Sequence, residues 1–249
     1  MFDPGHEELS RIDFGMLSAT EIVAMSVVEV CNPRLQSKTS SASDGSVYDI
    51  AMGTCPSTDR QRAQPCGTCG LTQYMCPGHF GHITLHTPIA NPMCMKHILT
   101  FLKCICFQCS RILTREGQLR MHGLTAIVGP ARFAKTADRI KGLEMCGHCS
   151  GFQPKFSLVV HEAQIYATQA ACATARHVRS EDMLRVFDAV SDVDVVALGL
   201  DPIRMHPRNL IIQVLPVIPT VSRPFSVSGG CVSDDDLSVQ YADIIKINN

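Results

Sequence analysis

The chain has 249 residues, of which 45% are hydrophobic and 18% charged, so it is long and apolar enough to fold around one or two cores. Lys and Arg number 22 and Asp and Glu 23, a net charge of -1, which excludes a polybasic nucleic-acid binder and leaves room only for local nucleic-acid contacts. Neither a signal peptide nor an apolar run near the ~18 residues of a membrane span is found, which predicts a soluble protein without a membrane partner. The 13 cysteines, several of them in pairs separated by two residues, indicate metal ligation in a reducing compartment rather than a disulfide framework.

The N-terminal part of the chain predicts a strand followed by a helix. Ile12 and Phe14 alternate with polar residues, as in a half-buried strand. Ser18 and Glu21 have the spacing of a capping box, in which each side chain bonds a free backbone amide at the helix start. The expected apolar face of this helix comprises Val23, Val27 and Val30.

The next elements are a polar loop and a second helix. Residues 31–46 are rich in Ser, Thr, Asn, Pro and Asp, and the small polar side chains at 40–45 cannot pack. Asn91 is expected as the N-cap of the second helix and Pro92 as its first residue, because proline lacks the amide that would be unpaired there. The predicted buried face of this helix comprises Ile98, Phe101, Leu102 and Ile105.

The region after residue 110 predicts short elements without an internal repeat. Residues 111–143 are weakly helical, and residues 156–160 have the composition of a strand. A helix with an acidic first turn is expected from Ser180, because carboxylates suit the positive end of the helix dipole. A short helix from Ser191 to Gly199 follows it.

The C-terminal region predicts a buried strand and a polar loop. Residues 210–215 form an apolar run that Pro216 and Pro219 are expected to break, and residues 226–236 are rich in Gly, Ser and Asp. The three adjacent carboxylates at 234–236 alternate in direction and lack the glycine spacing of a metal-binding loop, so a solvated turn is expected there.

The strongest motif is a C-x2-C-x6-C-x2-H pattern formed by Cys66, Cys69, Cys76 and His79. Two residues between ligands is the spacing of a tight turn, which lets both side chains face one ion while backbone amides bond the thiolates. Four such ligands leave no open coordination position, so the pattern predicts a structural, tetrahedral Zn²⁺ that contributes folding free energy. His82 is a rival for the fourth ligand.

A second set of cysteines consists of two pairs, Cys106 with Cys109 and Cys146 with Cys149, separated by 36 residues. Neither pair alone completes a tetrahedral site, so the two pairs most simply complete each other and hold a second structural Zn²⁺. Cys104 lies close enough in sequence to replace one of them. Basic residues between the pairs are candidates for sequence-independent phosphate contacts, with a solvated helix face as the alternative: Arg132, Lys135, Arg139 and Lys141.

An alternative for the first motif is the catalytic zinc site of nucleobase deaminases. Their H-x-E and P-C-x-x-C signature is matched formally by residues 6–8 and 65–69. This pattern leaves Cys76 and His79 without a role, and a closed four-ligand site has no position for an activated water. No Walker loop, Gly-x-Ser-x-Gly elbow or dinucleotide fingerprint occurs in the sequence, so no catalytic residue is predicted.

Residues 76–83, Cys-Pro-Gly-His-Phe-Gly-His-Ile, closely resemble the N-terminal clamp region of the largest subunit of multisubunit DNA-directed RNA polymerases. The resemblance covers nearly the whole chain. The segments at 205–207 and 215–217 are more similar to eukaryotic, archaeal or large-virus enzymes than to bacterial ones. Ala51 departs from the family, which usually has Arg at this position. Other segments follow in the family's order, namely 12–18, 48–53, 198–202, 205–207, 215–219, 223–224, 235–237 and 243–246.

The resemblance implies an α+β fold, irregular with short helices and strands, in which a zinc-stapled clamp core carries a zinc-binding clamp head. Its lid loop helps to separate the nascent RNA from the template, and by analogy Arg223 would lie near the upstream end of the RNA–DNA hybrid and contact phosphate; a surface arginine is the alternative. The expected parts are the strand, helix and loop of the clamp core (1–60), the clamp head (61–150), clamp core helices and strand (151–220), and a lid-like loop with a following strand (221–249).

The same resemblance implies a DNA-directed RNA polymerase, a nucleotidyltransferase in which this chain alone is inactive. Family members carry an Asn-Ala-Asp-Phe-Asp-Gly-Asp magnesium loop beyond the point where this sequence stops, so Mg²⁺ would be held by residues of other polypeptide. The implied partners are the second-largest subunit, the remainder of the largest subunit, other polymerase subunits, template DNA and nascent RNA. The implied location is a nucleus, or alternatively a viral factory or virion.

A stand-alone structural-zinc module that binds protein or nucleic acid is the competing function. A neutral net charge favours a protein partner for such a module. The ordered motifs after Cys149 argue against it, because a minimal zinc module does not need them.

Overall fold

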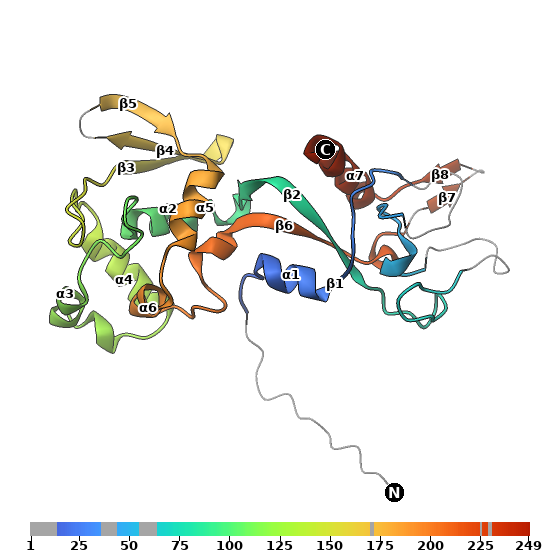
Figure 1. Cartoon of the computed structure of the whole chain (residues 1–249), viewed down its shortest axis with the longest axis horizontal. Helices are drawn as coiled ribbons and strands as arrows, with labels where there is room; N and C mark the ends of the chain where they lie inside the picture. The colour runs from blue at the N-terminus through green and yellow to red at the C-terminus, as the bar shows by residue number, and fades with distance from the viewer. Residues whose placement is uncertain (1–13, 36–43, 55–63, 170–171, 225, 229–230) are drawn as a thin grey trace, which may run out of the picture. The chain divides into compact units, whose positions relative to one another are not determined.

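The computed structural model of the chain describes residues 14–35, 44–54, 64–169, 172–224, 226–228 and 231–249 (Figure 1). The expected strand residue Ile12, the polar run at 40–43 and the deaminase-like residues 6–8 lie outside this part. Phe14 of the same expected strand is described; it is 90% exposed and lies in no strand, so the prediction of a half-buried strand is wrong there. The described residues form two compact units, each assembled from segments distant in sequence: those of the first unit lie within Met1–Leu17, Lys96–His177 and Arg185–Leu210, and those of the second within Ser18–Met95, Val178–Leu184 and Ile211–Asn249. The bounds of these units do not coincide with the ranges expected for the clamp core and the clamp head, and the division into those two parts remains a prediction.

The second unit is built on a three-stranded sheet in the order β1-β2-β6 (Figure 1). β1 runs parallel to β2, and β2 runs antiparallel to β6. Thr84 pairs with Val214 and Ile89 with Ile212, so β2 has extra residues opposite β6 and bulges between these pairs. The elements of this unit are α1 (Ala19–Met25), β1 (Ser26–Glu29), η1 (Ile50–Met52), β2 (Phe80–Ala90), η2 (Pro92–Cys94), β6 (Ile211–Val217), η6 (Thr220–Ser222), β7 (Ser226–Ser228), β8 (Cys231–Ser233) and α7 (Asp236–Asn248).

The first helix begins as predicted but ends early. Ser18 accepts a hydrogen bond from the Glu21 amide at 3.2 Å, and the Glu21 carboxylate accepts one from the Ser18 amide at 2.8 Å, which confirms the capping box. The helix ends at Met25 and the chain continues as β1, so placing Val27 and Val30 on a helix face is wrong. The β-branched residues after Met25 instead pair with β2, where extended backbone suits them.

Two further predictions for the C-terminal region are wrong. β6 continues through Pro216 to Val217. Because β6 lies at the edge of the sheet, the missing proline amide leaves no partner strand unpaired. The expected strand after the lid-like loop is the helix α7, whose buried residues Ser238, Ala242 and Ile245 recur at helical spacing.

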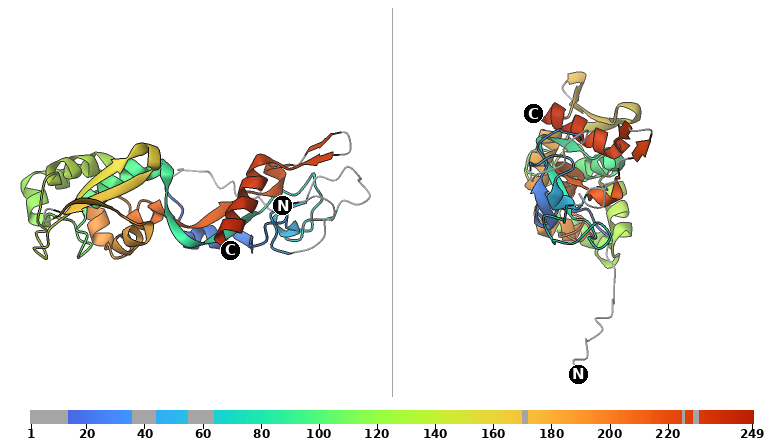
Figure 2. Two further views of the ribbon diagram at one scale, coloured as in Figure 1. Left: turned by 90° about the horizontal axis from the view of Figure 1, so that it is seen from above. Right: turned by 90° about the vertical axis from the view of Figure 1, so that its right-hand side faces the viewer.

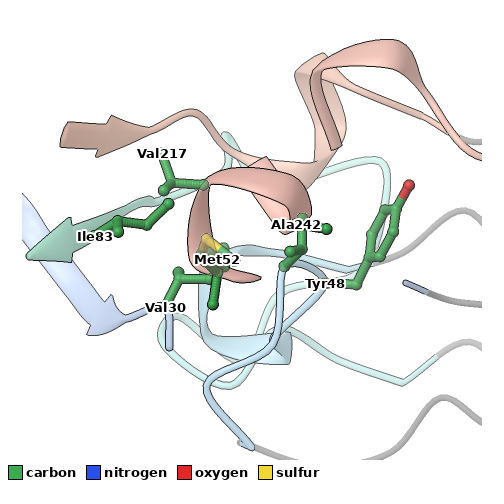
Figure 3. Packing of buried hydrophobic residues seen from close by; sticks show 8 residues of the cluster. Val30, Tyr48, Met52, Ile83, Val217 and Ala242 are labelled. Atoms are coloured by element: carbon green, nitrogen blue, oxygen red, sulfur yellow. The ribbon is translucent and has the colours of Figure 1, made fainter. Parts of the chain in front are cut away.

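The core of the second unit forms where the sheet, the η1 turn and α7 meet. Figure 3 shows Met52 at the centre of the labelled side chains, between Val30 and Ala242. Met52 and Val217 are each 0% exposed. Truncating such a side chain costs about 2–5 kcal/mol, through lost burial and the cavity left behind. The whole cluster comprises Val30, Val47, Tyr48, Met52, Ile83, Val217, Ala242 and Ile245.

The first unit combines an antiparallel sheet in the order β3-β4-β5 with short helices (Figure 1). As predicted, Asn91 is the N-cap and Pro92 the first residue of the turn that leads into α2; the Asn91 side chain accepts a hydrogen bond from the Met93 amide at 3.0 Å. The ring of Phe101 lies 4.6 Å from that of Phe133 and 6.1 Å from that of Phe187. The elements are α2 (Met95–Cys104), α3 (Glu116–Met121), η3 (Leu124–Ala126), α4 (Pro130–Ile140), β3 (Lys155–Val159), η4 (Val160–Glu162), β4 (Gln164–Gln169), β5 (Cys172–His177), α6 (Asp192–Ala197) and η5 (Pro207–Leu210). The helix α5 (Ser180–Asp188) is divided between the two units after Leu184.

The remaining predictions for this region agree with the structure. The strand expected at 156–160 is β3, the helix expected from Ser180 is α5, and Ser191 caps α6 through a 3.2 Å hydrogen bond from the Asp194 amide. Among the described residues, no helix has both the length and the apolar character needed to cross a bilayer. The chain is thus a mixed α+β protein of short helices and small sheets.

Two candidate metal centres

The first centre lies in the second unit and brings together the four predicted ligands Cys66, Cys69, Cys76 and His79. Their ligand atoms all lie within 4.8 Å of one another. The Sγ atoms of Cys69 and Cys76 are 3.6 Å apart, and Cys76 Sγ lies 3.7 Å from His79 Nε2. A tetrahedral Zn²⁺ with Zn–S bonds of about 2.3 Å needs sulfur atoms ~3.8 Å apart, so the donor set and its spacing fit this ion.

The second centre lies in the first unit and joins the two cysteine pairs. Cys106 Sγ is 3.6 Å from Cys149 Sγ, and Cys109 Sγ is 3.7 Å from Cys146 Sγ. These distances fit the same tetrahedral geometry. The four cysteines therefore lie where one ion would bind all of them.

Each C-x-x-C pair folds into the same turn, which thus occurs three times. The first cysteine of each turn accepts a hydrogen bond at its Sγ, 3.4 Å from the amide of Thr68, Gln108 or His148. The residue after the second cysteine donates its amide to the first cysteine's carbonyl and has a positive φ: 70° at Gly70, 58° at Ser110 and 56° at Ser150. The turn does not appear as an internal repeat in the sequence because only two cysteines and the small residue after them recur in each copy.

The amides of these turns shift thiol acidity in a position-dependent way. Burial alone would raise the pKa of Cys146, but the backbone amides of Cys149 and His148 and the thiols of Cys106 and Cys109 outweigh it and lower the pKa to about 7. Burial raises the pKa of Cys106 to about 12. In the first centre, hydrogen bonds likewise outweigh burial and lower the pKa of Cys66, whereas burial raises the pKa of Cys76 to about 11.

The carbonyl groups of the η1 turn accept hydrogen bonds from the loop that carries the first centre. The Gly67 amide donates to the Ile50 carbonyl at 3.1 Å, and the His79 amide donates to the Met52 carbonyl at 2.9 Å. The Thr68 hydroxyl donates to the Ala51 carbonyl at 2.7 Å. These bonds use only backbone atoms of the turn, so they do not depend on the arginine that the polymerase family usually has in place of Ala51.

Gln153 fastens the second centre to helix α2. Its Oε1 accepts from the Phe107 amide at 3.1 Å, while its Nε2 donates to the carbonyls of Leu102 at 3.1 Å and Ile105 at 2.7 Å. One side chain thus joins the segment after the last cysteine pair to the first pair and to the end of α2. Sequence reasoning missed this residue because a single glutamine four positions after Cys149 carries no motif.

The rival ligands lie outside both groups. His82 sits on β2 with its Nδ1 2.8 Å from Ser26 Oγ. Cys104 is fully buried near the end of α2, where burial raises its pKa to about 12. The deaminase alternative is also disfavoured, because Cys66 and Cys69 share their group with Cys76 and His79 and leave no open position.

A profile of the family described as RNA polymerase Rpb1, domain 1, matches residues 6–249. The chain belongs to this family. It is 31% identical to a probable DNA-directed RNA polymerase II subunit RPB1 homolog of Invertebrate iridescent virus 6 over 98% of the chain and 24% of that relative. It is 30% identical to a DNA-directed RNA polymerase subunit Rpo1N of Sulfolobus acidocaldarius over 95% of the chain and 27% of the relative.

A third relative is the DNA-directed RNA polymerase II subunit RPB1 of Euplotoides octocarinatus, 29% identical over 98% of the chain and 53% of the relative. The chain therefore spans between about a quarter and a half of the length of these curated relatives. Eukaryotic, archaeal and viral polymerases are all represented, in agreement with the resemblance seen in the motifs.

The predicted phosphate-contacting residues lie on or beside α4. Lys135, Arg139 and Lys141 are exposed, and Arg139 Nη2 lies 3.0 Å from His122 Nε2. Arg132 is partly buried, and the start of its side chain packs against Gly199. The group of four thus divides into three exposed cations and one cation that also has a packing role; their contact with phosphate stays a prediction.

Arg223 is 0% exposed, so its predicted contact with phosphate is wrong. Its guanidinium donates to the carbonyl of Ile218 at 3.0 Å, to Ser238 Oγ at 2.9 Å and to the carbonyl of Val47. The sequence alone did not reveal this burial because arginine is rarely inside a protein.

The carboxylates at 234–236 do not belong to either candidate metal group. Asp235 instead caps α7 by accepting from the Leu237 amide at 3.0 Å.

Proposed function

We propose that the chain is the N-terminal clamp portion of the largest subunit of a DNA-directed RNA polymerase, and that it helps to hold DNA and the RNA–DNA hybrid during transcription. The observation that carries this proposal is the family match over residues 6–249. The curated relatives, which are named as polymerase subunits, support it. In this proposal the fold is the clamp, and its lid-like loop lies within residues 221–249.

Each metal centre is proposed to hold one structural Zn²⁺. The ion supplies a cross-link between segments that the unfolded chain does not hold together, and such sites contribute about 10–16 kcal/mol of apparent binding free energy. The protein supplies the turns of Cys66, Cys106 and Cys146, whose amides point at sulfur and offset its negative charge. The centres are closed, so this role requires no water or substrate on the metal.

The exposed cations of α4 and its end are proposed to contact nucleic-acid phosphates. Lys135, Arg139 and Lys141 offer charge without base-reading geometry, which suits a clamp that must act on any sequence. The magnesium-dependent chemistry belongs to the assembled enzyme and is proposed to use residues outside this chain. The partners are then the second-largest subunit, the remainder of the largest subunit, template DNA and nascent RNA, in a nucleus or a viral factory.

The proposal is tested by native mass spectrometry of the tagged chain isolated from its own cells, with metal measured in the same sample. An assembly of several hundred kilodaltons that contains the chain and two zinc ions is the expected result. A lone zinc-bound chain would reject the polymerase assignment in favour of a stand-alone zinc module. A chain without zinc would reject the structural role of the metal.

The phosphate contacts are tested by salt dependence. Replacing Lys135, Arg139 and Lys141 together with Gln should reduce the slope of log affinity against log salt by up to about 3 units for duplex DNA, roughly one unit for each phosphate that is no longer neutralised. The matched control removes three exposed cations elsewhere. An equal slope for both triple variants would reject the assignment; the control residues are Arg34, Lys155 and Lys246, whose side chains are 67%, 76% and 57% exposed.

A further inference from the structure

The buried side chain of Arg223 joins its own segment to two others of the second unit, residues 47–52 and helix α7. Its Nη2 donates to the Val47 carbonyl and lies 3.8 Å from Met52 Sδ, both in the segment that leads to the first metal centre. Its carbon Cζ lies 5.3 Å from the ring centre of Tyr48 and 5.7 Å from that of Tyr241, within the range of cation–π attraction. A planar guanidinium with five donors holds such partners in one geometry, which a flexible ammonium cannot do.

The same side chain connects the two ends of the β7–β8 hairpin. Arg223 lies three residues before β7, and its Nη1 donates at 2.9 Å to Ser238 Oγ in the first turns of α7, after β8. Ser238 is 0% exposed. Figure 2 shows the hairpin strands running on from the start of α7. The hairpin therefore leaves the core at a point that Arg223 holds closed.

The loop that carries the ligands of the first centre, residues 66–79 (the metal loop), packs directly on the segment before Arg223. A Cβ added at Gly78, between the ligands Cys76 and His79, would lie 2.5 Å from Pro219 Cβ and 2.9 Å from a Val221 methyl group. Gly78 also has a φ of 82°, which glycine adopts without strain. Thr220, which is 1% exposed, approaches Gly53 in the same way, with its Oγ1 3.0 Å from an added Cβ.

We propose that Arg223 is a positioning residue that couples the first metal centre to the base of the β7–β8 hairpin. The chain of contacts runs from the metal loop through the η1 turn to Met52 and Val47, then through Arg223 to Ile218 and Ser238. All of these groups are packed or hydrogen-bonded. When the metal loop loosens, the η1 turn loses the hydrogen bonds that the loop donates to it. The Val47 carbonyl and Met52, which hold the Arg223 guanidinium, are then no longer fixed in place. Metal at the first centre thereby sets the exit direction of the hairpin.

This inference rests on metal binding at the first centre, as proposed above, and not on membership of a polymerase. Its two failures are distinguishable. A chain purified without metal in the first group would refute the zinc proposal, whereas a metal-loaded chain that behaves as uncoupled would refute only the role of Arg223.

The first test is amide hydrogen exchange of the 249-residue chain, read at Ser222 and Arg223, whose amides donate to the carbonyls of Pro219 at 3.1 Å and Thr220 at 3.2 Å. The Cys69→Ser chain, which disables the first centre, should exchange these two amides at least about tenfold faster than wild type. The Cys109→Ser chain disables the second centre instead and should leave them within about twofold. Equal effects of the two substitutions, or none, would overturn the proposal.

The second test runs in the opposite direction and measures metal release into a chelator. Arg223→Met removes the donors and keeps an apolar stem, and it should speed release from the first centre by about tenfold or more while release from the second is unchanged. Arg223→Lys keeps the charge without the fork and should give an intermediate rate, and Arg34→Met is the control for an exposed arginine. Wild-type release rates in both Arg223 variants would overturn the coupling; if Arg223→Met does not fold, Arg223→Lys decides this test.

Discussion

Gln153 offers a direct measure of how firmly the second metal centre is attached to its unit. Its side chain makes three hydrogen bonds, at 3.1, 3.1 and 2.7 Å, to the backbone of Phe107, Leu102 and Ile105. At about 1 kcal/mol for each bond, Gln153→Ala should cost ~3 kcal/mol of local stability. That cost corresponds to faster local opening by about two orders of magnitude.

Two substitutions separate the parts of this interaction. Gln153→Ala removes all three bonds. Gln153→Glu keeps an acceptor for the Phe107 amide but turns an oxygen toward the carbonyls of Leu102 and Ile105, so it loses two bonds and adds repulsion. We therefore expect Gln153→Glu to be at least as damaging as Gln153→Ala. Gln169→Ala, on the exposed end of β4, is the matched control and should be neutral.

The assay is hydrogen exchange of the Phe107 amide together with the rate of metal release from the second centre. Exchange at Phe107 should rise in the Ala variant and be partly retained in the Glu variant, whereas metal release should be fastest in the Glu variant. Wild-type release from Gln153→Glu would refute the reasoning, because it would show that Nε2 is not a donor to the end of α2. A change of equal size at both metal centres would refute it as well, since Gln153 contacts only the second.

Three further predictions concern metal stoichiometry, a glycine and a histidine. The Cys69→Ser chain should bind one zinc instead of two by metal analysis, because the structure places that thiol in one centre only; two retained ions would contradict it. Gly199→Ala should destabilise the chain by about 2 kcal/mol in urea unfolding, because φ is 85° and the added Cβ would lie 2.8 Å from both Cβ and Cδ of Arg132. Arg132→Ala removes Cγ and Cδ but keeps Cβ, so it should restore part of this loss; no loss, or no restoration, would count against that packing. Burial lowers the pKa of His206 in the folded chain below its ordinary value of 6.5. As the pH falls below about 6.5, the unfolded chain therefore binds a proton at His206 before the folded chain does. The free energy of unfolding should be unaffected by this group above about pH 6.5 and should decrease as the pH drops toward the folded pKa. His206→Gln should flatten the fall measured between about pH 7.5 and 5.5, and parallel curves would contradict this.

Local rules predicted the starts of helices well and their ends less well. The capping box of Ser18 and the Asn91–Pro92 start are decided by atoms within four residues, and both are found in the structure. The end of α1 at Met25 depends on the pairing of residues 26–29 with β2, more than 50 residues away. The apolar spacing cannot report such a partner: Val27 and Val30 have the spacing of a helix face, yet valine also favours strands, and in the extended chain Val27 is exposed and Val30 buried.

The metal centres could be predicted because cysteine pairs combine a local turn with an obligatory shared partner. A C-x-x-C turn closes within five residues, and a tetrahedral ion needs two such halves, so composition and spacing sufficed to bring together Cys106, Cys109, Cys146 and Cys149. Gln153 and the η1 turn escaped prediction because the Gln153 side chain bonds backbone atoms and the η1 turn offers its carbonyls, and backbone partners leave no pattern in side-chain identity.

The sequence by itself determined the two groups of candidate metal ligands, the helix caps and the membership of a polymerase family, since each depends on residue identities at fixed local spacing. Only the tertiary structure decided the fate of Arg223, whose motif resembled an exposed contact to nucleic acid. Its burial depends on acceptors at Val47, Ile218 and Ser238, which make an interior cation tolerable; Ile218 lies five residues before Arg223, and the other two come from other segments. Whether a charged side chain points to solvent or into a core is set by partners that the neighbouring sequence does not contain.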